Sequence, residues 1–138
     1  SNQPQEMVDK AHAFGLALGM AFQIQDDLMD YHAFGQSGKP TGIDVKEQKM
    51  TLPLIYALGV ASKLVKKAMM RIVKNKKDDP NSIKWLMEKV RALGGIEYAQ
   101  KRMGEWQQIA REHLQEFPEG EARQALNELV EYIGNRVR

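Results

Sequence analysis

The amino-acid sequence predicts an all-α protein, an antiparallel bundle of about five helices. The composition favours helices, because alanine, leucine, lysine, glutamate and glutamine recur and runs of β-branched residues are nearly absent. Apolar residues also return at steps of three and four along most of the chain, which places them on one face of a helix. The 138 residues are enough for one domain with a sizeable core.

The first half of the chain is expected to contain two long helices. The first covers residues 5–31, has no internal proline and is apolar around much of its circumference. Glycines and a proline predict a loop over residues 32–44. The second helix is expected over residues 51–73, because Thr51 is a candidate N-cap and Pro53 stands in the first turn.

Glycine and proline divide the second half into three further helices. A polar, proline-containing connection is expected over residues 75–81, after which Ser82 is the candidate N-cap of a helix that reaches Leu93. Gly94 and Gly95 then break that helix. The two remaining helices are expected over residues 96–117 and 122–133.

Composition and charge exclude several classes of protein. The chain is 43% hydrophobic and 28% charged with a net charge of +2, which is typical of soluble globular proteins and too weakly basic to indicate nucleic-acid binding. The absence of cysteine excludes disulfides and zinc–thiolate sites. The longest apolar stretch, residues 13–22, is too short to span a bilayer, and no signal segment opens the chain. We expect a cytoplasmic protein without a transmembrane segment.

Three aspartates, Asp26, Asp27 and Asp30, stand close together at the end of the first predicted helix. On a helix, Asp26 and Asp30 lie one turn apart on the same face, with Asp27 beside them. Like charges at this spacing repel one another, and the C-terminal end of a helix also disfavours negative charge. These two penalties favour a bound cation, and Mg²⁺ is the best candidate because it takes carboxylate oxygens together with water and substrate phosphates. The alternative is a solvated acidic helix end.

Two lysines follow the aspartates. Lys39 lies among glycines and a proline in residues 38–44, and Lys49 stands just before the next predicted helix. Glycine lets the backbone approach a phosphate closely, and lysine supplies a mobile positive charge. Each lysine alone is more often a solvated surface side chain. The combination with the aspartates predicts a magnesium–diphosphate site.

Three sequence segments carry a resemblance to a known family. Residues 22–30 read FQIQDDLMD, residues 38–44 read GKPTGID, and residues 49–58 read KMTLPLIYAL. Together they closely resemble the second aspartate-rich region of trans-isoprenyl diphosphate synthases. Shorter matches at residues 94–99 and 132–136 extend the resemblance over essentially the whole chain. The resemblance implies the C-terminal portion of an antiparallel helical bundle of the isoprenoid synthase type.

The resemblance also implies an activity, the head-to-tail condensation of an allylic diphosphate with isopentenyl diphosphate, with Mg²⁺ as the cofactor. Members of the family hold the departing diphosphate between two aspartate-rich motifs, and they are expected to be homodimers. By this resemblance, the metal ligands are Asp26, Asp27 and Asp30. The diphosphate-binding residues are Gln23, Lys39, Asp44 and Lys49. The residues with a catalytic role are Gln23, Asp26 and Lys39.

The first aspartate-rich motif of the family is missing from this sequence. Asp78 and Asp79 cannot replace it, because they stand in a polar connection after the second motif. We therefore expect residues 1–138 to be the C-terminal part of a polyprenyl synthetase domain, inactive alone, whose product length cannot be read. Two alternatives stay open, a related terpenoid cyclase and a non-catalytic paralogue or regulatory subunit. The segments that contain Lys39 and Lys49 argue against a cyclase. The presence of both the aspartates and the lysines argues against a non-catalytic paralogue or subunit.

Overall fold

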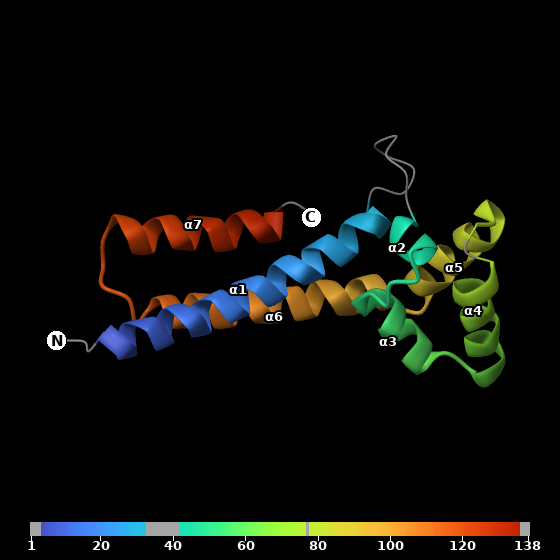
Figure 1. Ribbon diagram of the computed structural model, residues 1–138, viewed down its shortest axis with the longest axis horizontal. Coiled ribbons are helices and arrows are strands. Elements are labelled where there is room, and N and C mark those ends of the chain that lie inside the picture. The colour runs from blue at the N-terminus through green and yellow to red at the C-terminus, as the bar shows by residue number, and fades with distance from the viewer. Residues whose placement is uncertain (1–3, 33–41, 77, 136–138) are drawn as a thin grey trace. The chain divides into compact units, whose positions relative to one another are not determined.

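A computed structural model describes residues 4–32, 42–76 and 78–135 of the chain (Figure 1). Within these ranges all regular structure is helical, which confirms the predicted all-α class. The helices are α1 (Pro4–His32), α2 (Ile43–Lys46), α3 (Leu52–Val60), α4 (Lys63–Asn75), α5 (Pro80–Ala92), α6 (Gly95–Leu114) and α7 (Glu121–Asn135).

The chain divides into two compact units. The terminal unit combines residues 1–25 with residues 101–138, and the central unit comprises residues 26–100. Helices α1 and α6 each contribute one part to both units.

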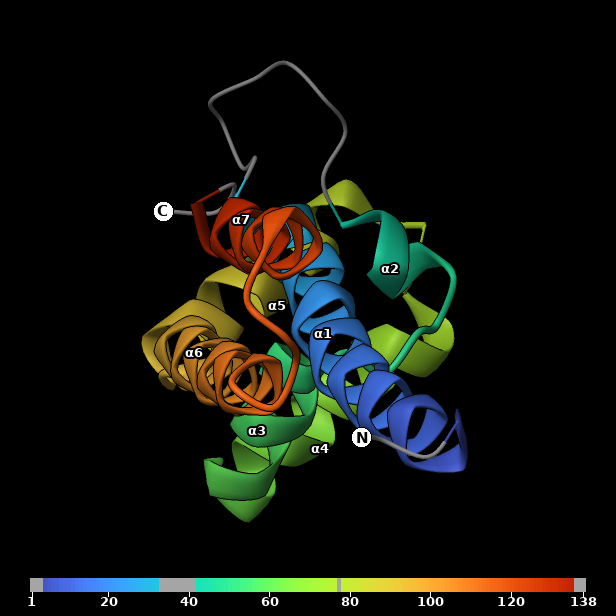
Figure 2. The same cartoon turned by 90° about the vertical axis from the view of Figure 1, so that its left-hand side faces the viewer.

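The terminal unit is built from three helices that lie side by side. The end view in Figure 2 shows the beginning of α1 next to α6 and α7, and the connection between α6 and α7 reverses the chain direction. Its core contains Phe14 and Ala17 of α1, Ala110 and Leu114 of α6, and Val130 of α7. All five are buried, so the three-helix packing removes a continuous apolar face from water.

Two buried glutamines add polar contacts to this core. Gln25 donates from Nε2 to the carbonyl oxygen of Ile133 at 2.6 Å, and Gln107 donates from Nε2 to the carbonyl oxygen of Val130 at 3.0 Å. Both acceptors lie on α7. The glutamines therefore fix α1 and α6 to α7 with directional contacts that apolar packing alone does not provide.

The central unit packs α3 and α4 against α5. Its buried residues include Tyr31 at the end of α1, Leu54, Met69, Leu86 and Val90. The beginning of α6 joins the unit through an aromatic pair, because the rings of Tyr56 and Tyr98 stack with their centroids 4.2 Å apart. This packing holds the end of α1 and the beginning of α3 in one compact region, where the candidate site lies.

The prediction of a single helix over residues 51–73 is wrong. The structure has two helices there, α3 and α4, separated by Ala61 and Ser62 in extended conformation. Ser62 is the N-cap of α4, and its hydroxyl oxygen accepts a hydrogen bond from the amide of Val65 at 3.3 Å. The apolar spacing continues across the break, so the pattern alone did not reveal it.

Two further boundaries differ from the prediction. Helix α5 begins at Pro80 with Asp79 as its N-cap, whereas the sequence favoured Ser82. Ser82 lies inside the first turn instead and donates its hydroxyl to Asp79 Oδ2 at 2.8 Å. The short helix α2 was not predicted: its first two residues fall within the predicted loop over residues 32–44, and its last two fall in the stretch before residue 51, where no element was predicted. In the part of the chain that the structure describes, no helix has the length and apolar character needed to cross a membrane.

Candidate functional site

The last turns of α1 carry the three aspartates into the central unit, and each has a different environment. The side chain of Asp26 is 60% exposed. Asp27 is buried, and its Oδ2 accepts a hydrogen bond from the amide of Leu52, the first residue of α3, at 3.1 Å. The first amides of a helix lack partners within it, so Asp27 satisfies one of them and links α1 to α3.

Lys49 lies between the first two aspartates. Its Nζ is 3.7 Å from Asp26 Oδ2 and 3.5 Å from Asp27 Oδ1. Burial acts to lower the pKa of Lys49, but the carboxylates of Asp44, Asp27 and Asp26 outweigh it, so the pKa of the ammonium group is raised above its ordinary value. Lys49 is therefore firmly cationic beside these carboxylates.

The third aspartate, Asp30, binds the backbone at the start of α2. Asp30 Oδ1 accepts a hydrogen bond from the amide of Ile43 at 3.1 Å. Its Oδ2 is buried and has no hydrogen-bond partner among the described residues. Burial raises the pKa of Asp30, although nearby backbone amides act in the opposite direction. An unpartnered buried carboxylate oxygen is costly, and a cation or its bound water is a natural partner for it.

Asp44 adds a fourth carboxylate to the region. Burial, followed by repulsion from the Asp30 carboxylate, raises the pKa of Asp44 to about 6. The carboxylates of Asp27 and Asp26 act on the pKa of Asp44 in the same direction, and the Lys49 ammonium group acts in the opposite one. The region therefore has a surplus of negative charge that a divalent cation would relieve.

The donors fit magnesium held in part by a ligand. Among the described residues, no three acidic or histidine side chains come together as a complete metal site. Magnesium does not need such a cage in enzymes that act on phosphates, because one or two carboxylates suffice and the substrate oxygens and water complete the shell. The exposed Asp26 and the unpartnered oxygen of Asp30 are donors of the required kind.

The structure brings together most, but not all, of the predicted site residues. Asp26, Asp27 and Lys49 are in direct contact, and Asp30 and Asp44 take part in the same electrostatic cluster. Gln23 is exposed on α1 within the terminal unit, and Lys39 lies outside the described residues.

The sequence did not reveal three groups that support the site. The backbone amides of Ile43 and Leu52 hold two of the aspartates, and Arg91 donates from Nη2 to the carbonyl oxygen of Tyr31 at 3.0 Å. Arg91 thereby places a positive charge at the C-terminal end of α1, where it interacts favourably with the negative end of the helix dipole. It stands 60 residues from its partner and belongs to no motif, so no local signal identified it.

Comparison with known proteins identifies the family. The family model described as polyprenyl synthetase matches residues 1–90. Solanesyl diphosphate synthase 2, chloroplastic, of Arabidopsis thaliana is 30% identical over 138 residues, which are 99% of this chain and 32% of the relative. The chain spans about a third of the length of this relative and of two other solanesyl diphosphate synthases that it matches.

Solved structures agree with this assignment. The geranylgeranyl pyrophosphate synthase from Bacteroides thetaiotaomicron superimposes with a TM-score of 0.85 at 34% identity, covering 99% of this chain and 44% of that one. A polyprenyl synthase from Caulobacter crescentus CB15, complexed with calcium and isoprenyl diphosphate, gives a TM-score of 0.81 at 27% identity, covering 94% of this chain and 40% of that one. These similarities confirm the predicted isoprenoid synthase type of bundle. Because the family model also covers well over half of its residues, the chain belongs to the polyprenyl synthetase family.

Proposed function

We propose that this chain supplies the second metal- and diphosphate-binding half of a trans-prenyl diphosphate synthase. The observation that carries the proposal is the contact of Lys49 with Asp26 and Asp27, at the end of a helix whose sequence resembles the family's second aspartate-rich motif. A similar structure is described as a complex with calcium and isoprenyl diphosphate. A divalent cation and a diphosphate at this cluster would be consistent with that description.

The proposed reaction transfers the prenyl chain of an allylic diphosphate to isopentenyl diphosphate, head to tail. The allylic carbon–oxygen bond breaks and the diphosphate leaves with the bonding electrons. The allylic carbon then bonds to the terminal alkene carbon of isopentenyl diphosphate, and a proton is lost to restore a double bond. A bound Mg²⁺ would neutralise charge that develops on the leaving diphosphate.

The residues of this chain have separable roles in the proposal. Asp26, which is exposed, would be the metal ligand most open to a bound diphosphate. Asp27 and Asp30 would hold the metal or its bound water, while they also hold the backbone amides of Leu52 and Ile43. Lys49 binds the diphosphate, and Lys39 remains a proposed partner for it. Asp44 supports Lys49 through its negative charge.

One face of α1 offers a place for the prenyl chain. Leu16, Met20 and Gln23 stand on successive turns of the helix, and all three are exposed. An apolar surface that ends in a glutamine suits a hydrocarbon chain whose reacting end lies near the polar residue. This arrangement supports the proposed role of Gln23 next to the reacting carbon.

Titration calorimetry tests the metal and diphosphate part of the proposal. We expect weak binding of Mg²⁺ alone and clearly tighter binding when a prenyl diphosphate or a bisphosphonate is present, because phosphate oxygens must supply part of the shell. Asp26→Asn should lower the metal-dependent affinity for the diphosphate by about tenfold or more, since a charge-assisted contact is lost. The matched control is Asp78→Asn, which removes an exposed carboxylate outside the cluster. Tight Mg²⁺ binding without any diphosphate, or equal affinity in both variants, would contradict the proposal.

The setting of the protein is a further part of the proposal. We place it in the cytoplasm, as its composition suggests, although the solanesyl relative is described as chloroplastic.

We also propose association with a second copy. The terminal unit has an apolar groove of about 300 Å³ whose lining includes the exposed residues Phe22, Leu129 and Tyr132. Contiguous apolar surface of this kind often marks an interface.

A further inference from the structure

One face of the central unit concentrates positive charge far beyond the chain average. Residues 61–92 contain ten lysines and arginines against three acidic residues, while the whole chain carries a net charge of only +2. Helix α4 itself has no acidic residue. Its exposed face presents Lys63, Lys67, Arg71 and Lys74, which recur at steps of three and four. We call these four side chains the basic face.

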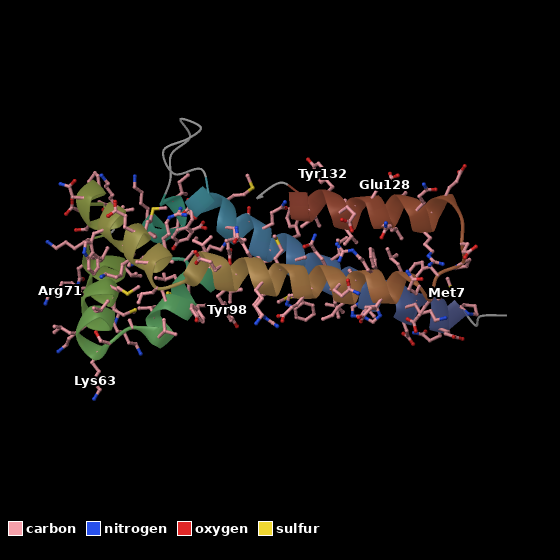
Figure 3. All side chains as sticks on the ribbon, turned by 180° about the vertical axis from the view of Figure 1, so that it is seen from behind. Met7, Lys63, Arg71, Tyr98, Glu128 and Tyr132 are labelled. Atoms are coloured by element: carbon pink, nitrogen blue, oxygen red, sulfur yellow. The ribbon has the colours of Figure 1, made fainter. Side chains whose placement is uncertain are left out.

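The basic face is not neutralised by the rest of the molecule. Among the described residues, no ion pair joins any of its four side chains to a carboxylate. Figure 3 shows Lys63 and Arg71 projecting from α4 away from the neighbouring helices. The carboxylate of Asp79, at the start of α5, accepts hydrogen bonds from Ser82 and from the amide of Asn81. The face is therefore available to an external anion.

Apolar groups accompany these charges. Leu64 is 81% exposed and shares the outward side of α4 with Lys67 and Arg71. A groove of about 360 Å³ lies between α4 and α5, and its lining includes Ala68, Ile72 and Trp85 with Arg71 and Lys76. Trp85 is itself partly exposed. Lysines and arginines around an exposed leucine and a tryptophan form the combination found at the surface of lipid bilayers.

We propose that the basic face, together with Leu64 and Trp85, docks the protein on an anionic lipid membrane. The inference does not depend on the proposed enzyme activity. Charge complementarity supplies the attraction, because clustered lysines and arginines bind the negative surface of such membranes. Leu64 and Trp85 enter the region of the headgroups. The buried side of α4, with Met69, Ile72 and Val73, stays packed on the protein core, so docking requires no unfolding of the helix.

A membrane explains the surface better than a nucleic acid does. Binding of a duplex needs positive charges along a groove or helix, but an exposed leucine beside them contributes nothing to it. An apolar side chain that enters the bilayer boundary adds to the affinity without adding charge. The two partners therefore predict different responses to the loss of Leu64.

Sedimentation with vesicles tests the proposal. The chain should bind vesicles of phosphatidylcholine mixed with phosphatidylglycerol and should not bind vesicles of phosphatidylcholine alone. The triple variant Lys67→Gln, Arg71→Gln and Lys74→Gln should lower the partition coefficient by about tenfold or more, because each charge contributes separately. Raised salt should also weaken binding.

Matched variants separate docking from general charge effects. Lys10→Gln, Lys101→Gln and Arg111→Gln also remove three positive charges, but from the terminal unit, and should leave binding close to that of the unchanged protein. Leu64→Gln keeps every charge and should weaken vesicle binding severalfold. Val8→Gln, at another exposed apolar position, should not.

Tryptophan fluorescence supplies a second readout. The chain has two tryptophans, so Trp106→Phe leaves Trp85 as the sole reporter. Its emission should move to shorter wavelength with the anionic vesicles, and circular dichroism checks that the variant keeps its helices. Equal binding to neutral vesicles, no shift of Trp85, or tighter binding to a DNA or RNA duplex that Leu64→Gln leaves unchanged would each overturn the proposal.

Discussion

Gly95, the first residue of α6, is a position where a side chain has no room. A Cβ atom there would lie 2.5 Å from the carbonyl oxygen of Pro53 and 2.8 Å from a methyl group of Val90. The first of these atoms belongs to the backbone and cannot rotate away. The glycine therefore allows α6 to approach α3 and α5 closely within the central unit.

Gly95→Ala should destabilise the protein by about 1–3 kcal/mol, the usual cost of overpacking a tight contact. Gly59→Ala is the matched control, because a Cβ atom on that glycine of α3 meets no other atom within 4 Å. That change should be neutral or slightly stabilising, since alanine favours a helix by about 1 kcal/mol over glycine. Thermal unfolding of both variants measures the difference. A fall in melting temperature of equal size in the two would show that the close approach at Gly95 is not the cause.

The sequence located the acidic cluster but could not divide its roles. The spacing of Asp26, Asp27 and Asp30 follows from the helix, and that part of the prediction needs only local geometry. The roles depend on partners far along the chain. Asp27 is buried and accepts a hydrogen bond from the amide of Leu52, 25 residues away, whereas Asp26 faces solvent. Such differences arise from tertiary packing, which the local spacing of residues does not reveal.

At the scale of the elements, the break between α3 and α4 is the main departure from the predicted helices. The sequence predicted one helix because Thr51 and Pro53 indicate its start, and apolar residues such as Leu58 and Met69 continue at helical spacing beyond it. The break depends on one polar side chain, Ser62, whose hydroxyl satisfies an amide at the start of α4. A serine between two apolar runs is a signal for an N-cap, and greater weight on it would have located the boundary.

Ser62→Ala should lower stability by about 1 kcal/mol, because the amide of Val65 loses its acceptor. Ser62→Asp should preserve or raise stability, since aspartate is an equally good N-cap and its charge favours the helix N-terminus. Thermal unfolding followed by circular dichroism distinguishes the two variants. If both lowered the melting temperature alike, the hydroxyl would not be acting as a cap.

At the scale of the whole molecule, the all-α class and the family were readable because both rest on patterns that span the chain. The exposed surface was harder to predict. The long first helix reads as apolar around much of its circumference. With the part of the domain that carries the first aspartate-rich motif missing, this pattern predicts that Phe14, Leu18 and Phe22 are exposed. Phe14 is instead buried and packs edge to face against Phe117, with the two ring centroids 6.1 Å apart, while Phe22 is 53% exposed. Only the fold determines which apolar side of α1 meets α6 and α7.

The remaining exposed apolar residues predict that the chain associates with itself. Phe22 and Tyr132 line the groove of the terminal unit, and their removal from water favours contact with a second copy. Sedimentation velocity across protein concentrations should show dimers or larger species. Phe22→Gln with Tyr132→Gln should shift the distribution towards monomer, whereas Ile55→Gln, at an exposed apolar position of the central unit, should not.

A separate prediction is that the chain does not elongate prenyl chains alone, and an isopentenyl-incorporation assay tests it. The sequence holds only the second aspartate-rich motif, so half of the groups that would clamp the diphosphate are missing from it. A folded chain that stays monomeric at every concentration would contradict self-association. Turnover by the 138 residues alone would contradict the stronger claim, that ionisation of the allylic diphosphate requires two facing acidic motifs.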